Sequence, residues 1–309
     1  MGATKQAATT LGRFSPIGWA EIDRLLDESA RALGRKVPRL RGRARALNGS
    51  IFALTVPHWA SELAGAKLSG KVLRELQLLQ AHLLTFFLIY DPVLDGDARA
   101  RTNPGEMLPL LLELHCGLSS FFDAGDAFWL DYRRLVRQQF ESSRWEIAGR
   151  GRPAPRFDAA LIRSLGLKLS LLRWPAYAVA RIAGRPDMAA LMDRIFDRFY
   201  RVLQLLDDVT DLETDRAKGQ INAVVAAMAA LPRRVSPDLA VAIGTARACA
   251  AARVELRKIR RELRGPAGRF ALACEYLDDC CRKSEQKASV LAGHLVAKDV
   301  CDHAISALA

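Results

Sequence analysis

Apolar residues recur at steps of three and four along most of the chain from Trp19 onward, as at Ile22 and Leu25 or at Leu191 and Ile195. This spacing is the period of an α-helix that buries one face. Runs of β-branched residues that alternate with polar ones, the pattern of a strand, are scarce. The pattern therefore predicts a chain built from α-helices.

Short clusters of Gly, Pro and Asn separate the helical segments and mark brief connections. They lie at 34–38, 48–50, 96–104, 149–155, 184–186, 232–237 and 265–268. About ten helices of ordinary length fill the chain, and no repeat or long linker divides it. We therefore predict a single all-α domain over 19–309. Residues 1–18 contain no acidic side chain and are expected to form a flexible tail.

The overall composition is that of a globular protein and excludes disordered and collagen-like chains. Lys and Arg number 46 and Asp and Glu 34, so the net charge is 46 − 34 = +12. The longest apolar stretch without a charge, 76–90, is interrupted by Gln77, Gln80 and His82 and is shorter than the ~18 to 20 residues of a membrane span. The six cysteines follow no secretory segment and form no CxxC pair. We expect a cytoplasmic protein with reduced thiols and no stable membrane insertion.

Asp207, Asp211 and Asp215 lie at four-residue steps near the end of a long apolar helix predicted over 191–215. Each step advances ~6 Å and turns ~40° around a helix, so these carboxylates form one file. Three like charges in a file destabilise the helix unless a cation balances them. Hard divalent cations prefer oxygen ligands. The spacing favours a magnesium site at these residues and the adjacent Asp208 over a solvated acidic face.

Asp91 and Asp95 form a second acidic pair at the end of another long apolar helix, predicted over 71–94. Pro92 removes a backbone donor and disfavours helix at Asp91, so we expect the helix to kink or end there. The pairs start 207 − 91 = 116 residues apart. Two such clusters, each closing a long apolar helix, extend the predicted magnesium site to Asp91 and Asp95.

Magnesium held by a few carboxylates completes its shell with water and substrate phosphates, so basic side chains are expected near the clusters. The candidates for binding a diphosphate are Arg99, Arg101, Arg163, Lys168 and Lys218. Neither GxxxxGK[ST] nor GxGxxG occurs in the sequence, so nucleotide binding through a glycine-rich loop is not indicated.

The run from Leu203 to Asp211 resembles the FQxxDDxxD signature of the trans-prenyltransferases, with Leu203 in place of Phe. Asp215 falls where those sequences carry a further Asp. The segment 91–95 resembles their first motif, DDxxD, with Pro92 at its second position. Arg99 and Arg101 resemble the basic pair that follows that motif, and the segment 168–184 resembles one that begins Lys-Thr-Ala. The chain thus resembles class I isoprenoid synthases over about 19–296.

This resemblance implies a helical bundle around a central apolar cavity, with the two acidic motifs facing each other at its mouth. Magnesium would bridge them to the diphosphate of a linear prenyl substrate, whose allylic C–O bond then ionises to a carbocation. A dry apolar cavity protects such a cation from water. Aromatic side chains that are candidates to line it are Phe86, Phe87, Tyr90, Trp174 and Tyr177.

Departures from the family pattern bear on the reaction. Chain-elongating members carry Gly-Gly-Lys-Arg-x-Arg for isopentenyl diphosphate, whereas only Lys36 and Arg39 keep that spacing here. We therefore favour a terpene synthase that converts the carbocation to a terpene. Chain elongation stays an alternative, because the second motif is all-aspartate as in prenyltransferases. Head-to-head condensation also stays open, since squalene and phytoene synthases carry DxxxD in both motifs.

Two further readings concern other classes of protein. Six basic residues and no acidic one lie in 35–45, which is compatible with a helical binder of nucleic acid or anionic membranes. That reading leaves both acidic clusters unexplained, so no nucleic-acid partner is expected. Pro92 is also compatible with an inactive homologue. Related folds are commonly dimeric, and a homodimer stays open.

Overall fold

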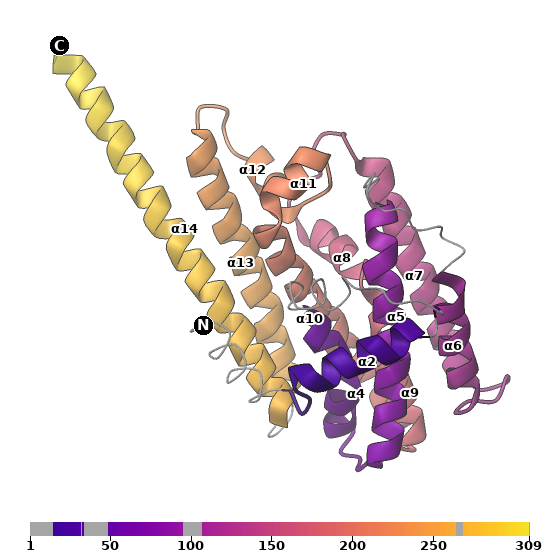
Figure 1. The fold of residues 1–309 in the computed structure, drawn as a ribbon. Helices are drawn as coiled ribbons and strands as arrows, with labels where there is room; N and C mark the ends of the chain where they lie inside the picture. The colour runs from indigo at the N-terminus through magenta and orange to yellow at the C-terminus, as the bar shows by residue number, and fades with distance from the viewer. Residues whose placement is uncertain (1–14, 32, 34–48, 95–106, 264–267, 309) are drawn as a thin grey trace. The chain divides into compact units, whose positions relative to one another are not determined.

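The structure is a computed structural model that describes residues 15–31, 33, 49–94, 107–263 and 268–308. The described part forms twelve α-helices and two short 3-10 helices, and no residue within it lies in a strand. Figure 1 shows their course along the chain. The prediction of an all-α protein is confirmed.

The chain groups into two compact units, each assembled from three separate segments. Unit 1 comprises Met1–Gln138, Leu169–Phe196 and Leu263–Ala273; unit 2 comprises Gln139–Lys168, Asp197–Glu262 and Cys274–Ala309. Three helices contribute residues to both: α7 (Phe128–Gly149), α10 (Ala189–Thr210) and α14 (Gly268–Leu308). The single domain over 19–309 stays a prediction.

Unit 1 is organised around α5. Besides its portions of the three shared helices, unit 1 contains α2 (Trp19–Arg31), α4 (Gly49–Leu63), α5 (Gly70–Leu94), α6 (Leu108–Ser119), η2 (Ser170–Arg173), α9 (Trp174–Ile182) and η3 (Pro186–Met188). Arg74 of α5 forms ion pairs with Glu21 and Glu28 of α2, and Ser29 donates to the carbonyl of Ala81 at 3.3 Å. These contacts bring the buried stripe of α2 onto α5.

By length and composition, the segment Gly70–Asp91 of α5 is apolar enough to cross a membrane. However, 72% of its most apolar window is buried inside the protein, as in an ordinary core helix. The buried side chains of Gln77 and Gln80 donate to the carbonyls of Leu54 and Leu172 at 3.3 and 3.1 Å. These bonds pair the amide nitrogens of both side chains, whereas Oε1 of Gln80 is buried without a hydrogen-bond partner in the described part of the structure.

Part of the segment predicted to be a flexible tail is packed in unit 1. Ser15 and Ile17 are buried, and the hydroxyl of Ser15 lies 3.0 Å from that of Thr55 in α4. The packed chain therefore starts before Trp19. Residues 1–14 lie outside the described residues.

Unit 2 contains α8 (Ala159–Leu167), α11 (Leu212–Lys218), α12 (Ala223–Ala229) and α13 (Pro237–Glu262), with its portions of the shared helices. Leu212, Val224 and Ala248 form a buried cluster between α11, α12 and α13. A Cβ on Gly244 would lie 2.8 Å from the carbonyl oxygen of Val224. Only glycine allows α12 and α13 to approach this closely, and this approach fixes the short helix that follows the acidic file.

Candidate functional site

The file of carboxylates formed by Asp207, Asp211 and Asp215, called the acidic file below, lies in unit 2. It spans the point where α10 ends and α11 begins. The predicted continuous helix over 191–215 is interrupted, because α10 ends at Thr210 and Asp211 forms a bend before Leu212. The amide of Asp211 still bonds to the carbonyl of Asp207 at 2.8 Å, and that of Asp215 to Asp211 at 2.9 Å. Helical hydrogen bonding thus continues through the bend.

Asp208 differs from its neighbours because it is buried and serves the local fold. One oxygen accepts from the side chain of Gln204 at 2.8 Å, and the other accepts from the amide of Ala223 at 2.6 Å. Asn222 donates to the carbonyl of Asp208 at 2.7 Å and to the carboxylate of Asp215 at 2.8 Å. Its side-chain oxygen caps α12 by accepting from the amide of Val224. These bonds fold the chain after α11 back onto α10.

Asp207 and Asp211 keep contact with solvent, and Asp215 is half-buried. Loss of water around the carboxyl is the largest cause that raises the pKa of Asp207 to about 6, and the charges of Asp211 and Asp215 raise it further. Burial is also the main cause that raises the pKa of Asp208 to about 7. The like charges are therefore close enough to interact, and nothing in the file itself neutralises them.

Lys168 is the cation that faces this group. It caps the C-terminal end of α8, and its Nζ lies 2.6 Å from Oε1 of Glu146 in α7. Burial alone would lower the pKa of Lys168, but the charges of Glu146, Asp208 and Asp207 outweigh it, so the pKa is raised above its usual range. Lys168 is thus charged and surrounded by carboxylates.

The position of Lys168 depends on the packing of α8. A Cβ on Gly166 would lie 2.4 Å from Cγ of Arg201 in α10, so glycine is required for this close approach. The hydroxyl of Ser142 in α7 donates to the carbonyl of Ser164 at 2.9 Å. The carboxylate of Asp158 caps the other end of α8. Helix α8 is therefore held on both α7 and α10, and its last turn directs Lys168 toward the acidic file.

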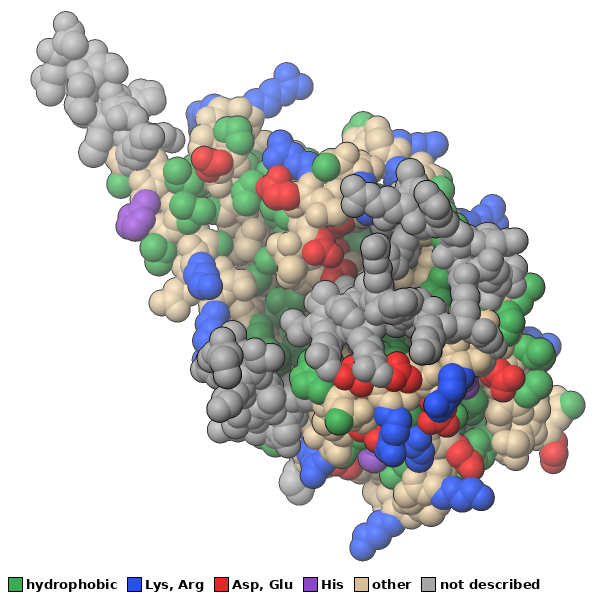
Figure 2. Space-filling model, viewed as in Figure 1, with side chains coloured by type: hydrophobic (Ala, Val, Ile, Leu, Met, Phe, Trp, Pro, Cys, Tyr) green, Lys and Arg blue, Asp and Glu red, His purple; other side chains and the backbone are tan. Residues whose placement is uncertain are grey.

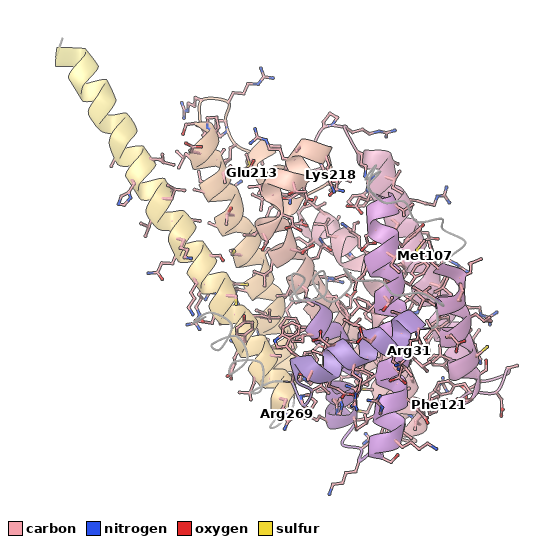
Figure 3. The ribbon with its side chains drawn as sticks, in the orientation of Figure 1. Arg31, Met107, Phe121, Glu213, Lys218 and Arg269 are labelled. Atoms are coloured by element: carbon pink, nitrogen blue, oxygen red, sulfur yellow. The ribbon has the colours of Figure 1, made fainter. Side chains whose placement is uncertain are left out.

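The structure brings five of the predicted site residues together in unit 2. The gathered residues are Lys168, Asp207, Asp208, Asp211 and Asp215. Arg163 is exposed on α8, and Lys218 lies in the last turn of α11 (Figure 3). Asp91 is exposed near the end of α5 in unit 1. Asp95, Arg99 and Arg101 lie outside the described residues.

The five aromatic candidates all belong to unit 1. Phe86 stacks on Tyr90 at 5.1 Å between ring centroids and meets Phe87 edge-on at 5.5 Å. Trp174 is fully buried. The hydroxyl of Tyr177 accepts from Arg134, whose guanidinium lies 5.5 Å from the ring centroid of Tyr177. The guanidinium of Arg134 therefore lies over the face of the Tyr177 ring. That these five residues line a cavity stays a prediction.

The carboxylate oxygens of the acidic file are ligands of the kind that magnesium prefers. Among the described residues, no three His, Cys, Asp or Glu side chains are arranged to hold a metal ion. Magnesium usually takes only one or two carboxylates, with water and phosphate as its other ligands. Asp207 and Asp211 offer such oxygens, one helical turn apart and exposed. Asp208 suits this role less well, because protein groups already bind both its oxygens.

Three residues of the site had no role in the sequence-based prediction. Glu146 gives no local signal, because its partner Lys168 is 22 residues away in the sequence. Gln204 stands four residues before Asp208, a spacing at which an amide reaches a carboxylate on one helix face. Asn222 directly precedes the apolar run that starts at Ala223, which is a sign of a helix N-cap. The last two were therefore accessible from sequence, and Glu146 was not.

Comparison of the chain with protein-family models and with curated proteins gave no match.

Proposed function

We propose that this chain is a Mg2+-dependent class I isoprenoid synthase, and within that class a terpene synthase. It would ionise a linear allylic prenyl diphosphate, convert the carbocation to a terpene and release diphosphate. The proposal joins the motif resemblance around Asp207 to the electrostatics of unit 2.

The observation that carries the proposal is the imbalance of charge around the file. Lys168 is the cation whose charge acts on Asp207, Asp208 and Asp215, and it is also bonded to Glu146. Carboxylates in such excess are costly unless a ligand brings positive charge. A magnesium ion would supply positive charge to the file, and the diphosphate of the substrate would accept hydrogen bonds from Lys168.

Each residue has a defined task in this proposal. Asp207 and Asp211 would hold the metal, which would supply neutralisation of charge on the departing diphosphate. Asp215 and Asp208 keep the backbone around the file in place through Asn222 and Ala223. Lys168 donates a proton of its ammonium group in a hydrogen bond to a diphosphate oxygen, while Glu146 orients that ammonium group.

The test is incubation of the purified protein with Mg2+ and geranyl, farnesyl or geranylgeranyl diphosphate, each with and without isopentenyl diphosphate. Released diphosphate is measured, and organic and aqueous products are analysed by mass. We expect a hydrocarbon or alcohol without isopentenyl diphosphate, and none in the presence of a chelator. A longer diphosphate that forms only with isopentenyl diphosphate would instead establish chain elongation. A product with the mass of two substrate chains would establish head-to-head condensation.

Site variants connect any turnover to the proposed ligands. Asp207→Ala and Asp211→Ala should each abolish magnesium-dependent turnover. Glu213→Ala is the matched control, because Glu213 is an exposed carboxylate on α11 that lies off the file (Figure 3). Full turnover in either aspartate variant would remove that residue from the metal site. The absence of diphosphate release from every substrate would contradict the proposal and favour an inactive homologue.

A further inference from the structure

Helix α6 of unit 1 is held against α5 by one of its sides. The residues of this inner side recur every four positions and are fully buried: Leu110, Leu114 and Leu118. A Cβ on Gly117 would lie 2.3 Å from Cδ2 of Leu79, so the two helices lie close together. The inner side therefore accounts for the packing of α6 in the fold.

The outer side of α6 is apolar as well. Leu108 and Leu112 are each 61% exposed and Leu130 of α7 is 64% exposed, which makes them the most exposed large apolar side chains among the described residues. Leu111 and His115 border a shallow depression together with Leu108 and Leu112. Figure 2 shows hydrophobic side chains along the right-hand edge of the view, where Figure 1 draws α6. A contiguous apolar surface of this kind marks an interaction site.

Helix α7 borders this surface with an aromatic side chain that has a polar tip. The ring of Trp129 lies parallel to that of His115, at 6.5 Å between centroids. Trp129 is partly exposed, and its indole N–H donates to the carbonyl of Asp123 at 3.0 Å. Tryptophan is enriched where one end of the side chain is in an apolar phase and the other is in contact with water.

Two arginines extend the surface along α7. Arg133 and Arg137 lie about one and two turns after Leu130 on the same side of the helix, and both are exposed. In the described part of the protein neither forms an ion pair, whereas Arg134 of the same helix is paired at 3.4 Å with an aspartate of α10. Helix α6 contains one acidic residue, Glu113. The surface therefore combines apolar side chains with an excess of positive charge, and its complement is apolar and anionic.

The length of α6 narrows the kind of partner. An apolar stretch of about 10 to 14 residues is typical of a buried core helix or of a segment at a membrane interface. Helix α6 has 12 residues, and the exposure of Leu108 and Leu112 differs from that of a core helix. It is also shorter than the ~20 residues of a helix that crosses a bilayer. These features favour a helix that lies at the surface of a membrane.

We propose that unit 1 binds the surface of an anionic membrane through a lipid-binding patch formed by Leu108, Leu112, Leu130, Arg133 and Arg137. The leucines enter the headgroup region, where their apolar surface leaves water, and the guanidinium groups bind lipid phosphates. Convex helix faces suffice for contact with a lipid surface, whereas a partner protein would need a groove shaped to fit them. The patch uses no residue of the acidic file, so this proposal does not rest on the proposed isoprenoid chemistry.

The test is co-sedimentation of the full chain with vesicles of phosphatidylglycerol or of phosphatidylcholine. We expect binding to phosphatidylglycerol that weakens as salt is added, because salt screens the charge of the arginines. Leu112→Glu should weaken this binding at least about tenfold, since it removes apolar contact and adds a charge that the lipid repels. Val290→Glu, at a 54% exposed position on α14, is the matched control and should keep the binding. Both substitutions are at exposed positions and should leave thermal unfolding unchanged.

A pair of charge reversals tests the arginines. Arg133→Glu with Arg137→Glu should weaken binding to phosphatidylglycerol at least about tenfold, since basic residues next to an anionic surface are attracted to it. Arg152→Glu with Arg156→Glu changes the net charge by the same amount at exposed positions of unit 2 and should weaken binding much less. Equal losses in the two double variants would mean that net charge, rather than the patch, attracts the vesicles, and would refute the proposal.

Fluorescence quenching locates the contact on the chain. Vesicles with brominated acyl chains should quench its tryptophan emission. Trp129→Phe should remove most of that quenching, because Trp129 borders the patch whereas Trp59 and Trp174 are fully buried. Quenching that survives in Trp129→Phe, or a chain that binds no phosphatidylglycerol at low salt, would overturn the proposal. A chain that binds no vesicles and whose molar mass in solution falls in Leu112→Glu would assign the patch to a second copy instead.

Discussion

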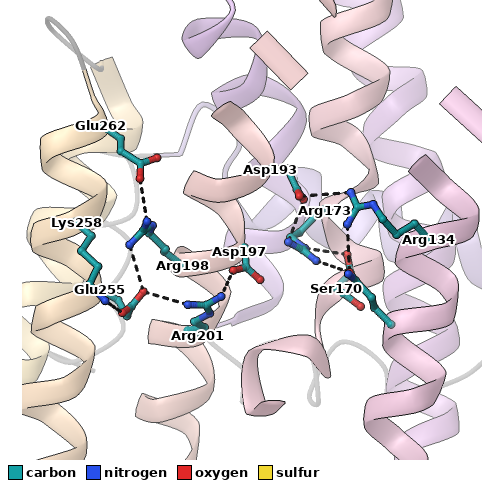
Figure 4. Close-up of polar contacts among 11 residues, drawn as sticks. Arg134, Ser170, Arg173, Asp193, Asp197, Arg198, Arg201, Glu255, Lys258 and Glu262 are labelled. Atoms are coloured by element: carbon teal, nitrogen blue, oxygen red, sulfur yellow. Dashed lines mark hydrogen bonds and ion pairs between the residues drawn. The ribbon is translucent and has the colours of Figure 1, made fainter. Parts of the chain in front are cut away.

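Unit 2 contains two clusters of charged side chains that differ in their balance. The first is a network of three cations and three anions: Asp197, Arg198, Arg201, Glu255, Lys258 and Glu262. Glu255 lies at its centre, 3.5 Å from Arg201 and 3.9 Å from Arg198 (Figure 4). The second group is the acidic file with Lys168 and Glu146, in which carboxylates outnumber the single ammonium group five to one.

The difference separates a structural role from a binding role. In the first group, each charge finds its partner within the protein, so the network needs nothing from outside and fixes α10 against α13. In the second group, burial is the largest cause that raises the pKa values of Asp207 and Asp208, and the charges of neighbouring carboxylates raise them further. Such unbalanced sites are where ligands and metals bind.

The largest expected effect is on turnover. Asp207→Asn keeps the shape of the side chain and removes one charge from the file. Magnesium-dependent release of diphosphate should fall by roughly 10³-fold, since the lost ligand acts on the charge that develops on the leaving group. The melting temperature in chelator should stay the same or rise, because a repulsion is removed. Lower stability together with unchanged turnover would reverse the roles assigned to the two groups.

The next largest effect is on stability and belongs to the balanced network. Glu255→Ala leaves Arg201 and Arg198 without their shared carboxylate in a buried position, where Glu255 itself is 5% exposed. Loss of one partner from such a buried network costs about 3 to 5 kcal/mol. Denaturant unfolding measures the loss, which should be the same with and without Mg2+. A magnesium-dependent loss would mean that the network also takes part in binding.

A smaller effect on stability is expected at Gly166, which lies between Arg201 of the balanced network and Lys168 of the unbalanced group. Gly166→Ala places a methyl group 2.4 Å from Cγ of Arg201 and should force α8 away from α10. Overpacking of this kind costs about 1 to 3 kcal/mol. Because Lys168 follows two residues later, the variant should also raise KM for the prenyl diphosphate. Gly184→Ala is not a useful control, because that glycine has a φ of 66°.

A second variant separates the position of Lys168 from the stability of α8. Glu146→Gln keeps a hydrogen-bond acceptor for Lys168 but removes its charge partner. It should alter KM more than unfolding, whereas Gly166→Ala should alter both. Glu141→Gln, an exposed carboxylate on the same helix, is the control for KM. An unchanged KM in Glu146→Gln would argue that Glu146 does not orient Lys168.

The sequence predicted the helical class and the file itself, since both follow from spacing along one segment. It did not predict the break at Asp211, because the residue lies inside an otherwise continuous helical pattern and no Gly or Pro marks the bend. Nor did it separate Asp208 from Asp207. The two are adjacent and chemically identical, and only the amide of Ala223, 15 residues later, binds Asp208 in the fold. Long-range partners such as Glu146 for Lys168 are set by packing between helices, which local spacing does not encode.

The smallest expected effect is the pH dependence of stability in the metal-free protein. The pKa of Asp207 is about 6 in the folded chain and 3.8 as its ordinary value, so the folded state binds more protons between these pH values. Unfolding free energy should therefore fall as pH rises from about 4 to about 6. The pKa difference corresponds to about 3 kcal/mol, and the solvent exposure of Asp207 reduces this to ~1 kcal/mol.

Thermal unfolding in chelator at a series of pH values measures this slope, and Asp207→Asn should reduce it, while Asp208, whose pKa burial raises to about 7, still contributes to it. Added Mg2+ should stabilise the protein above pH ~6, where the carboxylate is ionised, and have little effect near pH ~4, where protons compete with the metal. Glu255→Gln is the control, because its network should respond to neither Mg2+ nor this pH range. Equal stabilisation by Mg2+ at both ends of the range would mean that the ion binds somewhere other than the file, and the contrast between the balanced and unbalanced groups would then lose its functional meaning.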